Sequence, residues 1–155
     1  MNLVKICGIT EEQEVEYVNE AGVDFMGMVM FFPKSKRNIT VEKASSLIKK
    51  LNPAVTSVAV TVEPTLDQIR EIEAAGIQMI QIHGDISQEL LQEIHIPVIK
   101  AFNVHDLSSY EKYHQADIVK GYIFDAQTPG SGKTFTGLYF PIFRTMRSLH
   151  FLLVV

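Results

Sequence analysis

The sequence of 155 residues contains a single cysteine, Cys7, and this scarcity excludes a disulfide framework. It also has no segment long and apolar enough for a membrane-spanning helix, and no signal-peptide pattern at its start. Its 14 lysines and arginines face 18 aspartates and glutamates without forming a basic stripe, so nothing favours nucleic-acid binding. No pair of histidines has the spacing of metal ligands. We therefore expect a cytoplasmic protein without a metal and without a nucleic-acid or membrane partner.

Apolar residues make up 46% of the chain, which is enough for one globular domain with a buried core. Strand-like and helix-like segments alternate along it. The expected strands end at about Cys7 and cover 24–30, 55–62, 77–83, 97–102 and 119–125. The expected helices cover 11–21, 41–51, 66–75, 87–94 and 107–114, with Thr10, Thr40 and Thr65 as the first three N-caps. This order predicts an α/β fold with a parallel sheet and right-handed crossovers.

Two architectures fit this order, an open doubly wound sheet and an eight-stranded barrel of which about six strand–helix units are present. Periodicity does not distinguish them. However, Cys7, His83 and Asp125 each lie at the carboxyl end of a different strand, and Arg37 lies in the loop after another. A closed barrel gathers such residues around one mouth, whereas an open sheet spreads them along an edge. We therefore favour an incomplete TIM (β/α)8 barrel.

Cys7 has two interpretations. It is either a small buried apolar side chain or a reactive thiol. A thiolate needs positive partners or helix N-terminal amides, and the turn over 8–10 offers amides. Lys5, two residues earlier in the same strand, is expected to point to the same side as Cys7.

Asp125 and His83 also leave alternatives open. Asp125 follows the apolar residues 122–124, so a poorly solvated setting would raise its pKa and suit it to general acid catalysis. It could equally cap the following turn. His83 is either a hydrogen-bonded loop residue or a substrate contact.

The glycine-rich segment 128–134 ends in Gly-Lys-Thr, which is similar to a nucleotide-binding P-loop. The P-loop also requires a glycine five residues before the second one, and Gln127 stands there. We favour a loop that covers the site.

Four stretches in order along the chain resemble phosphoribosylanthranilate isomerase, the barrel enzyme family of tryptophan biosynthesis. They are Val-Lys-Ile-Cys-Gly-Ile-Thr at 4–10, Phe-Pro-Lys-Ser-Lys-Arg at 32–37, Gln-Ile-His-Gly at 81–84, and the segment 124–135. Lys36 replaces a proline of the family pattern. Thr61 and Glu63 stand where the family usually has Phe and Asn.

The resemblance implies an Amadori rearrangement of N-(5-phosphoribosyl)anthranilate, an isomerase reaction on a small phosphosugar that requires no cofactor. It implies Cys7 as general base and Asp125 as general acid. Arg37 would pair with the anthranilate carboxylate, for which a guanidinium fork is well shaped. We place His83 and Lys5 with the substrate-binding residues. The oligomeric state is not predicted.

The resemblance ends at Phe135, which divides the chain into a barrel-type isomerase domain, 1–135, and an aberrant tail, 136–155. Codons can be chosen for 136–140 that read Asp-Trp-Thr-Leu-Phe once one deleted base is restored before Thr136. Codons can also be chosen for the chain end that read Phe-Leu-Ala-Gly-Gly in the same frame, and both readings are family features. We therefore expect a frameshifted tail; the alternative is a natural variant in which 151–155 forms a strand.

The family binds its phosphate in the loops after strands seven and eight, which the tail does not resemble. We therefore expect poor folding and little turnover from this truncated chain. The other class of function is a non-catalytic barrel fragment that self-associates through its open sheet edges.

Overall fold

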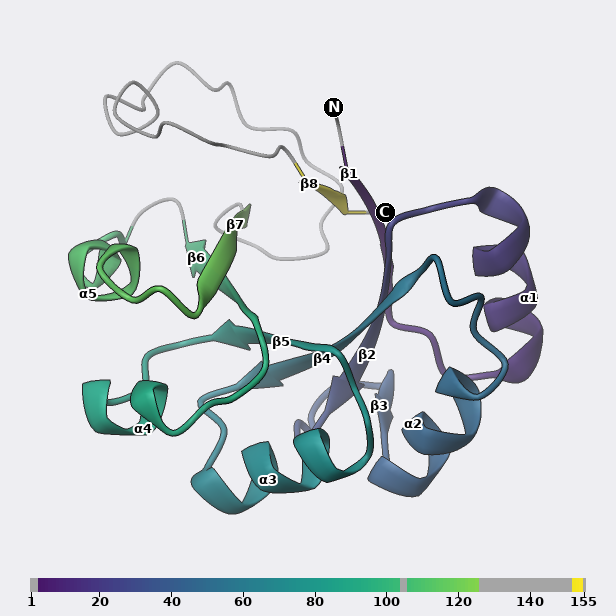
Figure 1. Ribbon diagram of the computed structural model, residues 1–155, viewed down its shortest axis with the longest axis horizontal. Coiled ribbons are helices and arrows are strands. Elements are labelled where there is room, and N and C mark those ends of the chain that lie inside the picture. Colours follow the sequence, from purple (N-terminus) through teal and green to yellow (C-terminus); the bar gives the residue numbers. More distant parts are fainter. Residues whose placement is uncertain (1–2, 104–105, 126–151, 155) are drawn as a thin grey trace.

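The structure is a computed structural model that describes residues 3–103, 106–125 and 152–154 (Figure 1). Six strands form the main parallel sheet: β1 (Leu3–Cys7), β2 (Phe25–Met30), β4 (Thr56–Val62), β5 (Met79–His83), β6 (Val98–Asn103) and β7 (Val119–Asp125). Five helices connect them: α1 (Glu12–Ala21), α2 (Val41–Ile48), α3 (Leu66–Ala74), α4 (Gln88–Gln92) and α5 (Tyr110–His114). Two short strands, β3 (Asn38–Ile39) and β8 (Leu152–Val154), pair with β2 and β1.

The strand order is β7-β6-β5-β4-β2-β1-β8, and all of these neighbours are parallel. The sheet curls, and the helices lie on its outer side (Figure 1). This is the arrangement of a partial TIM barrel, so the expected fold class is confirmed. The edge of β1, which the sequence leaves open, is paired with β8.

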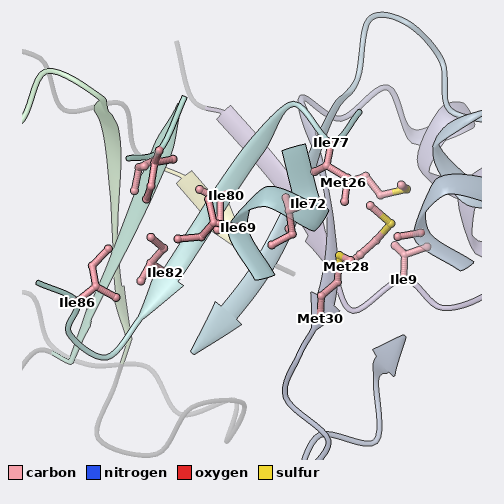
Figure 2. Close-up of a cluster of buried hydrophobic side chains, with 14 of the residues drawn as sticks. Ile9, Met26, Met28, Met30, Ile69, Ile72, Ile77, Ile80, Ile82 and Ile86 are labelled. Carbon is pink, nitrogen blue, oxygen red and sulfur yellow. The ribbon is translucent and has the colours of Figure 1, made fainter. Parts of the chain in front are cut away.

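Alternate residues along the strands face two different layers. The outward side chains of β2 and β5, among them Met26, Met28, Ile80 and Ile82, pack with helix residues such as Ile69 (Figure 2). A second, smaller cluster comprises residues of the inner face: Val58, Val60, Ile99, Ala101 and Ile123. Inward side chains therefore alternate with the main core, as barrel geometry requires.

The helix starts are determined by short polar side chains. Thr40 and Thr65 cap α2 and α3 as expected, because each hydroxyl accepts the N–H three residues on, at 3.3 Å. The expected cap at Thr10 is wrong, since Glu11 is the N-cap of α1. The reason is Glu14, whose carboxylate accepts the Thr10 hydroxyl and the N–H groups of Thr10 and Glu11.

All five helices are shorter than expected, and α2, α4 and α5 differ most; α2 shows why. After Ile48 the chain continues in turns, in which Lys50 N–H donates to Leu47 O and Leu51 N–H donates to Ile48 O. These are i→i+3 bonds of turns rather than α-helical bonds. The α-helix therefore ends before the apolar periodicity of the sequence does.

The expected tail and the glycine-rich loop fall outside the described residues, apart from β8. The division of the chain at Phe135 therefore stays a prediction. Within the described ranges, no helix is long and apolar enough to cross a membrane.

Candidate functional site

The carboxyl end of β1 places Cys7 beside a tight turn. Gly8 adopts a φ of 84°, a left-handed conformation that favours glycine. Its N–H and that of Ile9 both donate to Gly27 O on β2, at 2.9 and 3.0 Å. Cys7 itself is half-buried and packs against the inner apolar cluster. The turn fixes where the thiol lies without covering it.

Lys5 lies two residues before Cys7 on β1, and its side chain is fully buried. Both side chains approach Gly27 of the neighbouring strand. A Cβ atom built on Gly27 would lie 2.8 Å from Lys5 Nζ and 2.9 Å from Cys7 Sγ. The expected common side of Lys5 and Cys7 is therefore present, and Gly27 leaves the space that their end groups use.

Arg37 reaches back to the same strand end. Its Nη1 donates to Gly8 O at 3.0 Å and lies 3.1 Å from Glu14 Oε1. Hydrogen bonds from the Thr10 N–H and then from Glu11, Thr10 Oγ1 and Arg37 hold the pKa of Glu14 below its ordinary value against the opposing effect of burial. The Arg37 side chain remains 59% exposed. It therefore lies beside the thiol's turn with access to solvent.

His83 ends β5, three strands away from β1 in the sheet. Gln81 Nε2 donates to His83 Nε2 at 2.7 Å. Gln81 is buried, and its Oε1 has no hydrogen-bond partner within the described residues. The pair gives the carboxyl-end half of β5 a polar character.

Asp125 is the last residue of β7, where its backbone pairs with Asn103 of β6. Its side chain lies outside what the structure describes, so its role and its raised pKa stay predictions. Because the strands are parallel, the ends of β1, β5 and β7 all lie at one edge of the curled sheet. The structure thus brings Lys5, Cys7 and Arg37 together and places the other two residues along the same edge.

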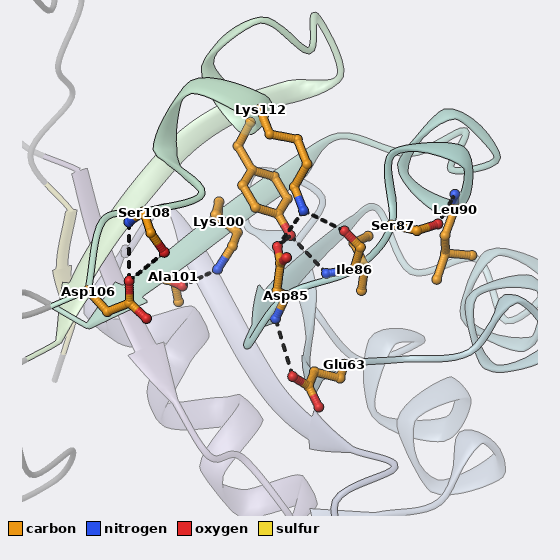
Figure 3. A network of polar contacts seen from close by, with 11 residues as sticks. Glu63, Asp85, Ile86, Ser87, Leu90, Lys100, Ala101, Asp106, Ser108 and Lys112 are labelled. Carbon is orange, nitrogen blue, oxygen red and sulfur yellow. Dashed lines mark hydrogen bonds and ion pairs between the residues drawn. The ribbon is translucent and has the colours of Figure 1, made fainter.

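A polar network outside the predicted site surrounds Lys100 and Asp85 (Figure 3). Lys112 Nζ and Tyr113 Oη donate to Asp85 Oδ1, at 2.6 and 2.7 Å. Burial opposes ionisation of Asp85, but the hydrogen bonds from Lys112 and Tyr113 hold its pKa below its ordinary value. Burial lowers the pKa of Lys100 to about 8. The sequence signal for this network was a lysine within the buried run 98–102.

The part of the chain that the structure describes contains no group of three or more histidine, cysteine, aspartate or glutamate side chains able to hold a metal ion.

Comparison with known proteins identifies the family. The sequence model of N-(5'-phosphoribosyl)anthranilate isomerase matches residues 4–140. The chain belongs to this family. The match ends at residue 140 rather than at Phe135, so the family likeness extends slightly into the segment expected to be aberrant.

One relative is the N-(5'-phosphoribosyl)anthranilate isomerase of Streptococcus gordonii, 39% identical over 136 residues, which cover 87% of this chain and 67% of the relative. The phosphoribosylanthranilate isomerase structure from Thermotoga maritima has a TM-score of 0.73 and 33% identity, covering 87% of this chain and 66% of that one. The chain thus spans about two thirds of the length of these relatives.

A third relative was solved in complex with reduced 1-(o-carboxyphenylamino)-1-deoxyribulose 5-phosphate. It has a TM-score of 0.70 and 29% identity, and the alignment covers 83% of this chain and 77% of that one. The ligand is bound by that protein.

Proposed function

We propose that the site at the carboxyl ends of β1, β5 and β7 isomerises N-(5'-phosphoribosyl)anthranilate to 1-(2-carboxyphenylamino)-1-deoxyribulose 5-phosphate, a step of tryptophan biosynthesis. The observation that supports this most strongly is the family match over 4–140, which includes Cys7, Arg37, His83 and Asp125. The related complex with a reduced carboxyphenylamino-deoxyribulose phosphate points to the same class of substrate.

The reaction needs one general acid and one general base. We assign the acid to Asp125 and the base to Cys7. The Asp125 carboxyl donates its proton to the furanose ring oxygen, and the bond from that oxygen to C1 breaks to leave a protonated Schiff base. The Cys7 thiolate takes the proton from C2, and the C–H electron pair forms the C1–C2 double bond of an enolamine. Tautomerisation then gives the ketone. Both groups are general acid–base catalysts, and no cofactor is needed.

Arg37 is assigned to the anthranilate carboxylate. Its guanidinium lies beside the Cys7 turn and is more than half exposed, so a planar anion has room to pair with it. His83 is assigned to a contact with the phosphosugar. A cytoplasmic location fits a pathway enzyme of this class.

The test must separate the site from the tail, because the sequence predicts little turnover from the chain itself. We would assay consumption of N-(5'-phosphoribosyl)anthranilate by the chain and by a chimera. The chimera keeps residues 1–135 and continues with the corresponding segment of the Thermotoga maritima relative. We expect turnover in the chimera and a loss of at least ~100-fold in its Cys7→Ala variant, the usual contribution of general base catalysis.

A folded chimera without turnover would overturn the proposed function. Full turnover in Cys7→Ala would leave the reaction standing but remove Cys7 as its base. Substantial turnover by the chain itself, lost in Cys7→Ala, would contradict the expectation that residues 136–155 impair it.

A further inference from the structure

The Lys5 amine is in an unusual position for a charged group. Its side chain has no exposed surface, and Nζ forms no hydrogen bond with any described residue. A buried ammonium without a partner is costly, because desolvation removes its hydration and nothing replaces it. An anion beside Nζ would offset that cost.

The group placed to become that anion is Cys7 Sγ. Lys5 and Cys7 are two residues apart on β1, so they share a face of the sheet. Their end atoms converge on one point above Gly27, with Nζ at 2.8 Å and Sγ at 2.9 Å from the position of an absent Cβ. A side chain at position 27 would force the amine and the thiol apart.

Among the residues that the structure describes, three other charged side chains near β1 have partners. Arg37 is paired with Glu14 at 3.1 Å and donates to Gly8 O, so much of its charge is compensated. Glu14 lies on α1 and is itself paired with Arg37. Asp24, in the turn before β2, accepts the Val4 N–H at the opposite end of the strand. Lys5 is therefore the cation for which the described residues near β1 provide no hydrogen-bond partner.

We propose that Lys5 is a positioning residue that holds Cys7 as a thiolate through a buried ammonium–thiolate contact over Gly27. The inference rests on the proposed function in that it accounts for the charge of the assigned base. It also explains why a buried lysine is tolerated on the inner face. A nearby positive group is one of the features that make a cysteine thiolate at neutral pH.

The contact can be tested without turnover, because Cys7 is the only cysteine and its alkylation is unambiguous. We would measure the rate of alkylation of the whole chain by neutral iodoacetamide between pH 6 and 9. Lys5→Met retains the length of the side chain and removes its charge. We expect the reactivity profile to move up by about one pH unit, which slows alkylation several-fold at neutral pH.

Lys100→Met is the matched control, since it also removes a buried lysine but acts on the outer side of β6. We expect its alkylation rate at neutral pH to stay within about twofold of the parent chain. A Lys5→Met profile that coincides with the parent profile would overturn the proposal. If the profile is unchanged and only the KM for the phosphosugar rises, Lys5 binds substrate anions instead.

A second measurement needs no variant and covers the case in which Lys5→Met does not fold. The alkylation profile of the parent chain should rise at a lower pH when the chain is folded than in urea, because only the folded chain places the amine beside the thiol. We compare the pH midpoints rather than the absolute rates, since the thiol is half-buried in the folded chain. A folded chain whose midpoint is no lower than that of the unfolded one would contradict the proposal. Alkylation that depends on Lys5 in a folded chimera lacking isomerase turnover would reject the proposed function alone.

Discussion

Lys100 makes the stability of this fold depend on pH in the alkaline range. Its side chain is only 2% exposed and lies under the ring of Tyr113, with Nζ 4.4 Å from the centre of the Phe102 ring. Burial lowers its pKa from 10.5 to about 8, against the attraction of Asp85. The folded chain therefore releases this proton at a lower pH than the unfolded chain does.

The sign of the effect follows from proton binding. Between about pH 8 and 10.5 the unfolded state holds a proton on Lys100 that the folded state has released, so the free energy of unfolding rises with pH. Below that window both states are protonated, and the fold bears the full cost of the buried ammonium. A shift of this size corresponds to about 3 kcal/mol over the whole window.

Three tyrosines limit the gain at higher pH. Burial raises the pKa of Tyr122 to about 12 and raises those of Tyr113 and Tyr110 as well. Above about pH 10 the unfolded state loses phenolic protons that the folded state keeps, so the free energy of unfolding falls again. Maximum stability is therefore expected at roughly pH 9–10.

Lys100→Met tests this reasoning directly. Urea unfolding followed by circular dichroism at pH 7.5, 8.5 and 9.5 should show the parent chain gaining about 2 kcal/mol. The variant should gain nothing over the same range, because it has no amine to titrate. An equal rise in both chains would assign the effect to other groups, and a flat parent profile would refute the buried-ammonium argument.

The remaining predictions concern Gly27 and the tail. Gly27→Ala should lower the melting temperature, because the new Cβ would lie within 3.0 Å of the fully buried Lys5 side chain and of Cys7 Sγ. It should also slow alkylation of Cys7 by iodoacetamide several-fold. Gly121→Ala is the control with no expected effect, since its Cβ would come no closer than 4.0 Å to any described neighbour. Equal rates in the two variants would remove Gly27 from the site. Sequencing the coding DNA from the codons of 132–134 onward should reveal a single base shift that restores Asp-Trp and Phe-Leu-Ala-Gly-Gly; a confirmed reading frame without one would establish the tail as a natural variant.

The strands and their carboxyl ends could be predicted because the evidence for them is local. The run 119–125 is bounded as expected, and Thr40 and Thr65 cap their helices through side-chain oxygens three residues from the bonded N–H. Asp85 and Lys112, by contrast, are 27 residues apart and meet only because β5 and β6 are neighbours. Such a contact depends on the tertiary arrangement and has no sequence period.

The mismatch at Glu63 illustrates a departure that the structure explains. Glu63 has a φ of 45°, a left-handed conformation that asparagine, the residue usual at this place in the family, adopts more readily. Its side chain lies where a Cβ on Gly84 would be, and its Oε1 accepts the Asp85 N–H at 3.4 Å. The strained glutamate and the glycine therefore depend on each other, which neither position indicates alone.

The two buried lysines show most clearly where sequence reasoning ends. Lys5 and Lys100 each interrupt an apolar strand, in Val-Lys-Ile and Ile-Lys-Ala, and alternation does not say which face of a strand becomes the inside of the barrel. The strand neighbours decide it. Lys100 shares its face with Phe102 and the aromatic residues of α5, so its amine is desolvated within a structural layer. Lys5 shares its face with Cys7 and meets Gly27, so the same burial places its charge beside the only thiol. Burial of a lysine amine therefore makes stability depend on pH on one face and, as we propose, supports catalysis on the other.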